Sequence, residues 1–214
     1  IPEGAYVRSV REDPRRKGLL FAGTETGLHV SFDDGARWQP LQLNLPTSPI
    51  HDLVVKDDDL VVATHGRSFW ILDNITPLRQ LNAQVAAAET HLYTPQTSIR
   101  FRGGRSLLRG RPVGENPPDG AILDYYFKAA PKDEATLEIL DSRGKLLRKY
   151  SSKKQPDDRP KSEEPEEEPA FESMPAEAGM NRFVWKLRAS TASRISGYSL
   201  GDYLDGERGP LVPP

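Results

Sequence analysis

The octet Ser31-Phe32-Asp33-Asp34-Gly35-Ala36-Arg37-Trp38 decides the fold of this chain, and it follows the pattern S-x-D-x-G-x-x-W. The carboxylate of Asp33 is suited to accept hydrogen bonds from nearby backbone amides, and Gly35 tolerates the positive φ of a tight turn. Trp38 is predicted to begin the outgoing strand and to bury its ring. We therefore interpret the octet as a self-contained turn in which Ser31, Asp33, Gly35 and Trp38 are structural.

Short apolar segments precede and follow the octet. The strands predicted around it are Tyr6–Arg11, Leu19–Thr24, Leu28–Ser31 and Trp38–Leu41, and those of a second series are Ile50–Lys56, Leu60–Thr64 and Ser68–Leu72. Val10 and Val54 are 44 positions apart, while Thr24 and Thr64 are 40 apart. A repeat of about 40 residues is typical of β-propeller blades, so residues 1–80 are predicted to form two consecutive blades, of which the second ends the propeller.

A connector is predicted at residues 81–116. Helix-compatible residues from Leu78 to about Ala88 favour a short helix or an extended exit segment. One more strand is predicted at Leu92–Phe101, and the stretch Gly103–Asn116 is interpreted as a loop.

A second domain is predicted at residues 117–214. Its strands are expected at Ala121–Ala130, Thr136–Leu140, Lys145–Tyr150 and Gly179–Arg188, with a hairpin turn at Asp141–Gly144. This pattern predicts a β-sandwich of immunoglobulin or fibronectin type, so the whole chain is expected to be all-β. The proline-rich end Gly209–Pro214 indicates the approach to a further strand, and we expect the sandwich to lack its final strand.

An acidic tract interrupts the second domain. From Lys153 to Ala178 the chain holds nine Asp or Glu, four Lys or Arg and five Pro. Such a composition does not offset the ordering entropy of about 1–2 kcal/mol per residue, so a disordered loop is predicted at about 153–178. A solvated spacer is the favoured interpretation, and a site for a basic partner is the alternative.

The overall composition excludes several classes of partner. A net charge of −2 provides no basic surface for nucleic acid, and no apolar run reaches the roughly 18 residues of a membrane span. The chain has no Cys, which excludes disulfides and thiolate metal sites. No H-x-x-x-H or D-x-D-x-D-G pattern occurs, and Asp57–Asp59 is interpreted as a solvated turn rather than a Ca²⁺ site. No metal or cofactor is therefore predicted.

Four polar residues at strand ends are the candidate ligand-facing residues. His51 and Asp52 open the innermost strand of the second blade, where a central channel would lie. Adjacent residues of a strand point to opposite faces, so we do not expect these two to form a dyad. His65 and Arg67 flank Gly66 in the turn before the next strand. For each pair, ligand binding and a purely structural role are both open interpretations.

Three stretches together resemble a known family: Leu20–Leu41, His51–Val54 with Ala63–Asp73, and Asn181–Arg188. They are similar to the C-terminal part of bacterial sortilin-type propeller proteins with an appended β-sandwich, often called glycosyl hydrolases with BNR repeats. In that family the octet is known as an Asp box, and it lies at the blade periphery, away from the central site of sialidases.

This resemblance implies an exported, periplasmic or extracellular, bacterial protein that recognises a protein or glycan ligand without catalysis. It also implies that the remaining propeller blades of the parent chain are partners of this segment. The alternative is the C-terminal portion of a sialidase-like glycoside hydrolase whose catalytic residues lie mainly upstream. No catalytic residue is assigned within the segment.

Overall fold

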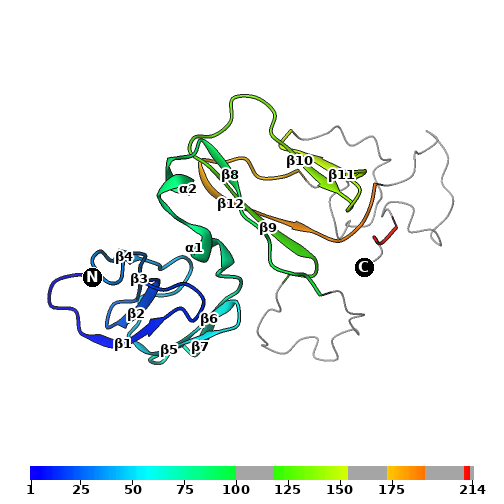
Figure 1. Cartoon of the computed structure of the whole chain (residues 1–214). Helices are drawn as coiled ribbons and strands as arrows, with labels where there is room; N and C mark the ends of the chain where they lie inside the picture. The colour runs from blue at the N-terminus through cyan, green and yellow to red at the C-terminus, as the bar shows by residue number, and fades with distance from the viewer. Residues whose placement is uncertain (100–117, 154–172, 191–209, 213–214) are drawn as a thin grey trace, which may run out of the picture. The chain divides into compact units, whose positions relative to one another are not determined.

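The computed structural model describes residues 1–99, 118–153, 173–190 and 210–212, and the chain separates into two compact units, Ile1–Ala86 and Ala87–Pro214 (Figure 1). The described residues form four antiparallel sheets and two short helices, and none of the sheets closes on itself. The predicted all-β class is therefore confirmed.

The first unit contains two antiparallel meanders. One has the strand order β1-β2-β3-β4 and the other the order β5-β6-β7. Their bounds are β1 (Val7–Glu12), β2 (Leu20–Thr24), β3 (Leu28–Ser31), β4 (Gln39–Pro40), β5 (Ile50–Lys56), β6 (Asp59–Thr64) and β7 (Phe69–Leu72). Every strand predicted in this region is present. One prediction was wrong, since Trp38 precedes β4 and is only half-buried. β4 has two residues, and Pro40 has no amide hydrogen with which to extend the pairing.

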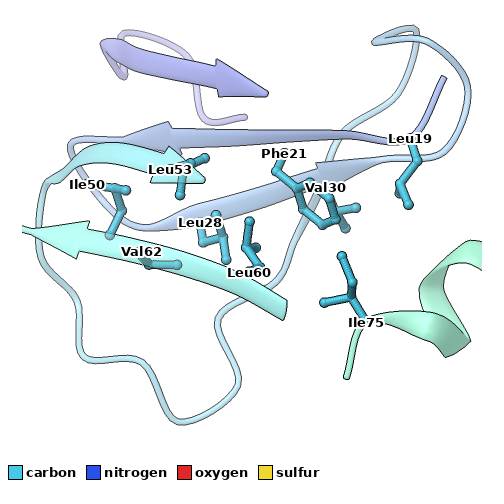
Figure 2. Close-up of a cluster of buried hydrophobic side chains, with 9 residues drawn as sticks. All are labelled: Leu19, Phe21, Leu28, Val30, Ile50, Leu53, Leu60, Val62 and Ile75. Atoms are coloured by element: carbon cyan, nitrogen blue, oxygen red, sulfur yellow. The ribbon is translucent and has the colours of Figure 1, made fainter. Parts of the chain in front are cut away.

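The two meanders share one apolar core. Successive side chains of a strand point to opposite faces, and the apolar residues on one face of each sheet meet in this core. Figure 2 shows the side chains between the strands of the two sheets: Leu19, Phe21, Leu28, Val30, Ile50, Leu53, Leu60, Val62 and Ile75. A Cβ atom at Gly23 would lie 2.6 Å from Cγ2 of Ile50. The absence of a side chain at Gly23 thus allows the sheets to approach closely.

A buried ion pair links the helical segment to both meanders. The predicted short helix occurs as α1 (Thr76–Gln80) and α2 (Ala83–Ala87). In α1, Nε of Arg79 donates to Oδ2 of Asp13 at 2.8 Å, and its terminal nitrogens donate to the Asp58 carboxylate and the Asp57 carbonyl. The Arg79 side chain is 10% exposed and that of Asp13 is 0% exposed. This network joins the β1–β2 connection, the β5–β6 turn and α1.

The second unit combines a three-stranded sheet with a hairpin. The sheet has the order β12-β9-β8, with bounds β8 (Thr90–Leu92), β9 (Ala121–Phe127) and β12 (Gly179–Trp185), and the hairpin pairs β10 (Thr136–Leu140) with β11 (Leu146–Ser151). Their shared core contains Leu123, Tyr125, Leu137, Tyr150, Met174 and Phe183. This arrangement is compatible with a β-sandwich.

Two segments of the second unit differ from the expected pattern. Of the strand predicted at Leu92–Phe101, residues 93–99 are not in a strand, because β8 spans Thr90–Leu92 and Pro95 lacks the amide needed to continue pairing; positions 100 and 101 lie outside the described residues. In the acidic tract, the Met174 side chain is 4% exposed and its amide donates to the Ser151 carbonyl at 3.0 Å. Residues 154–172 of the tract and the predicted loop at Gly103–Asn116 lie outside the described residues.

Candidate functional site

The octet forms a turn held by two side chains. Oγ of the buried Ser31 donates to Oδ1 of Asp33 and accepts from the Gly35 amide, both at 2.9 Å. Oδ1 of Asp33 also accepts from the Arg37 amide at 2.8 Å, while Oδ2 accepts from Nε of Arg37 at 2.8 Å. Asp34 and Gly35 have φ values of 58° and 86°, which a tight turn requires. The turn therefore fixes the direction of the Arg37 side chain.

The charge of Asp33 follows from these contacts. The hydrogen bond from the Arg37 side chain, then that from the Arg37 amide, lower the pKa of Asp33 from 3.8 to about 2, and the Ser31 hydroxyl adds to the effect. A general acid requires a pKa near the working pH. Asp33 is thus suited to hold Arg37, rather than to transfer a proton at neutral pH.

Trp38 packs against the turn at Gly35. A Cβ atom at Gly35 would lie 3.7 Å from Cζ2 of the indole, which is an ordinary contact distance. The indole is half-buried, and its N–H donates to no residue in the described part of the chain. The Cζ2 and Nε1 edge of the ring system thus lies against the turn, and the rest of the indole is only partly covered.

A groove of about 650 Å³ lies beside the octet within the first unit. The octet and its neighbour contribute to the lining, and so do Arg16 and the helical segment: Phe32, Asp33, Arg37, Trp38, Gln39, Leu81, Asn82, Ala83 and Ala86. The guanidinium of Arg16 lies 5.3 Å from the centroid of the Phe32 ring and donates to the Leu78 carbonyl. Burial lowers the pKa of Arg16, while Asp13 opposes this change. The groove thus combines two cations with two aromatic rings.

Of the four candidate residues, the structure brings the two histidines together. The rings of His51 and His65 stack with their centroids 4.8 Å apart and an interplanar angle of 29°. Ile50 pairs with Thr64, and Asp52 pairs with Ala63, so the register shifts at His51. A bulge of this kind interrupts the alternation of side chains and re-aims one of them.

The contacts of Asp52 and Arg67 do not involve the stacked rings. Asp52 forms an exposed ion pair with Arg11, with 2.5 Å between Oδ1 and the arginine nitrogen. The Arg67 side chain is exposed, and it has no hydrogen-bond or ion-pair partner among the described residues. Within those residues, no group of three His, Asp or Glu could hold a metal ion. Of the four candidates, His51 and His65 therefore form a stacked pair, and Asp52 is in an ion pair with Arg11. Arg67 is a cation without a side-chain partner among the described residues.

The groove was missed by sequence reasoning. Arg37 could have been identified from the sequence, because it occupies a variable position of the octet, four residues after Asp33. Arg16 and Asn82 line the same groove although 66 positions separate them. No local pattern connects residues so far apart, since only the packing of the helical segment beside the first meander brings them together.

Comparisons with family models, with curated proteins and with solved structures found no match to this chain. In the described part of the chain, no helix has both the length and the apolar character needed to cross a membrane.

Proposed function

We propose that this chain is a non-catalytic recognition segment, built from two consecutive β-propeller blades and a β-sandwich, that binds a protein or glycan ligand. The observation that supports it best is the stacking of two successive antiparallel meanders on a shared core. Propellers are built by radial repetition of such meanders. The octet lies between β3 and β4, which is where an Asp box lies in a blade.

The outer face of the second meander supports the blade interpretation. Phe69, Ile71 and Val54 are 74%, 57% and 49% exposed. Ile71 pairs with Val61, and Val61 pairs with Val54, so an apolar row crosses the sheet on the face opposite the shared core. Exposed apolar patches commonly mark interaction sites. We propose that a further blade of the same kind covers this face, as the second meander covers the first.

A dye-binding experiment on the full chain tests the exposed face. We expect the chain to bind a hydrophobic dye, and the double substitution Phe69→Ser, Ile71→Ser to remove most of that fluorescence. The matched control is Leu140→Ser with Leu146→Ser, because these residues are 52% and 48% exposed on the β10–β11 hairpin. A monomeric chain that melts cooperatively and binds no dye would contradict the proposed blade contact.

Turnover of a glycoside would distinguish the alternative, a sialidase-like hydrolase, from the proposed recognition role. If the full-length protein hydrolysed a sialoside or another glycoside, the non-catalytic part of the proposal would be wrong.

A further inference from the structure

Arg37 is the residue of the groove that is best placed to bind an anion. Its side chain is 90% exposed, yet Oδ2 of Asp33 holds its Nε at 2.8 Å. The two terminal nitrogens have no hydrogen-bond partner among the described residues. A guanidinium presents such nitrogens as a planar fork that matches the two oxygens of a carboxylate. Asp33 thus orients Arg37 while leaving this fork available.

The charge of the groove complements a single carboxylate. Arg16 and Arg37 contribute two positive charges and Asp33 one negative charge, which leaves one net positive charge along the described lining. Arg16 already donates to the Leu78 carbonyl and stacks on Phe32. Among the described residues that line the groove, only Arg37 therefore offers a free fork, which favours a ligand with single carboxylates over one with clustered phosphates.

The remaining lining matches the two kinds of surface on a sugar ring. A pyranose has an apolar C–H face and an edge of hydroxyl groups. Trp38 supplies a half-buried aromatic ring, and Gln39 and Asn82 supply side-chain amides. Ligand sites of about 300–1,000 Å³ commonly combine aromatic side chains with a few polar groups, and the groove of about 650 Å³ lies in this range.

We infer that this groove binds an acidic oligosaccharide, in which a uronate carboxylate pairs with Arg37 and a neighbouring sugar ring stacks on Trp38. The inference rests on the recognition role proposed above, and it names the class of ligand and its place on the first blade. The groove lies beside the octet, so this site uses none of the candidates His51, Asp52, His65 and Arg67.

Calorimetric titration of the full chain with tetragalacturonate tests the ligand class. Methyl-esterified tetragalacturonate is the matched control, because it keeps the sugar rings and removes the charge. We expect the acid to bind about tenfold more tightly than the ester, since the fork forms charge-assisted hydrogen bonds only with the carboxylate. The difference should shrink as ionic strength rises. Equal affinity for acid and ester, or binding of neither, overturns the inference.

Substitutions of lining residues test whether the oligosaccharide binds in the groove. Arg37→Gln should weaken binding of the acid about tenfold and leave the ester unchanged, whereas Trp38→Phe should weaken binding of both. Arg67→Gln is the control, because Arg67 is an exposed arginine of the same unit outside the groove. Circular dichroism and melting temperature identify any variant that fails to fold, and Trp38→Phe retains an aromatic ring for that reason.

The outcomes separate this inference from the recognition role on which it rests. Tetragalacturonate binding that survives Arg37→Gln and Trp38→Phe would overturn the groove assignment and leave recognition standing. Tighter binding of a glutamate-rich peptide, lost in Arg37→Gln, would overturn the saccharide class alone. The dye-binding result at Phe69 and Ile71 is independent of both, because those residues do not line the groove.

Discussion

Asp33 connects the stability of the octet with the orientation of Arg37. One oxygen accepts from the Ser31 hydroxyl and the Arg37 amide, and the other accepts from the Arg37 side chain. A single carboxylate thus closes the turn and positions the cation of the proposed saccharide site. Substitution of Asp33 is expected to affect both folding and ligand binding.

The ionisation of Asp33 should be visible in how the stability of the fold depends on pH. The pKa of Asp33 is lowered from 3.8 in the unfolded chain to about 2 in the fold. A lowered folded-state pKa means that the charged form stabilises the fold fully above about pH 4, and that this contribution is lost as the pH falls toward 2. We expect Asp33→Asn to lower the melting temperature at pH 7 and to have less effect at pH 2. A difference between the two proteins that is constant from pH 7 to pH 2 would contradict this assignment.

Residue roles could be predicted where one short segment contains all the partners. The octet meets this condition, because Ser31, Asp33 and Gly35 contact one another within the turn. The stacking of His51 on His65 could not be predicted, since it depends on a bulge in β5. A bulge adds one residue to a strand and leaves no distinctive composition in the sequence.

Among the elements, α1 is attached to the meanders by charge as well as by apolar contact. Arg79 reaches Asp13 and Asp58 from the helix, and Asp13 also accepts from the amides of Arg15 and Arg16. Because Asp13 is fully buried, removal of Arg79 leaves a carboxylate without its charged partner in the interior.

A comparison of two single substitutions measures how strongly the buried ion pair stabilises the fold. We expect Arg79→Met to lower the free energy of unfolding by about 3 kcal/mol, because it leaves Asp13 buried and unpaired. Arg8→Met removes an ion pair with Glu25 whose side chains are 42% and 31% exposed, and it should cost less than about 1 kcal/mol. Chemical denaturation of both variants gives the comparison. Equal costs would mean that burial does not control the strength of the Arg79 network.

Strands could be predicted well because alternation is a local property. β3 and β5 have the predicted bounds, and the other predicted strands of the first unit differ by one residue at one or both ends. The exceptions depend on contacts elsewhere in the chain. β8 needs β9 as its partner across the intervening sequence, and α1 and α2 are too short to show a clear helical period.

At the scale of the whole molecule, the residues that the structure describes form two apolar cores. One belongs to the unit Ile1–Ala86 and includes Phe21, and the other belongs to Ala87–Pro214 and includes Phe183. Each core is formed by residues of its own unit. Thermal unfolding of the full chain is therefore expected to show two contributions.

Calorimetry of two variants assigns these contributions. Phe21 and Phe183 are 0% and 4% exposed, and replacing either by Ala is expected to cost about 3–5 kcal/mol in its own unit. We expect Phe21→Ala to shift one transition and Phe183→Ala to shift the other. If both variants shifted one common transition by the same amount, the two units would unfold as one cooperative body.

The short edge strand β4 has a consequence for aggregation. Pro40 lies at the edge of the first sheet and offers no amide hydrogen, and the strand is only two residues long. Unpaired sheet edges are templates on which foreign strands add, and natural proteins protect them with short strands and proline. The edge at β4 is therefore a poor starting point for fibril growth. We expect self-association of this sheet by hydrogen bonding to be suppressed at β4.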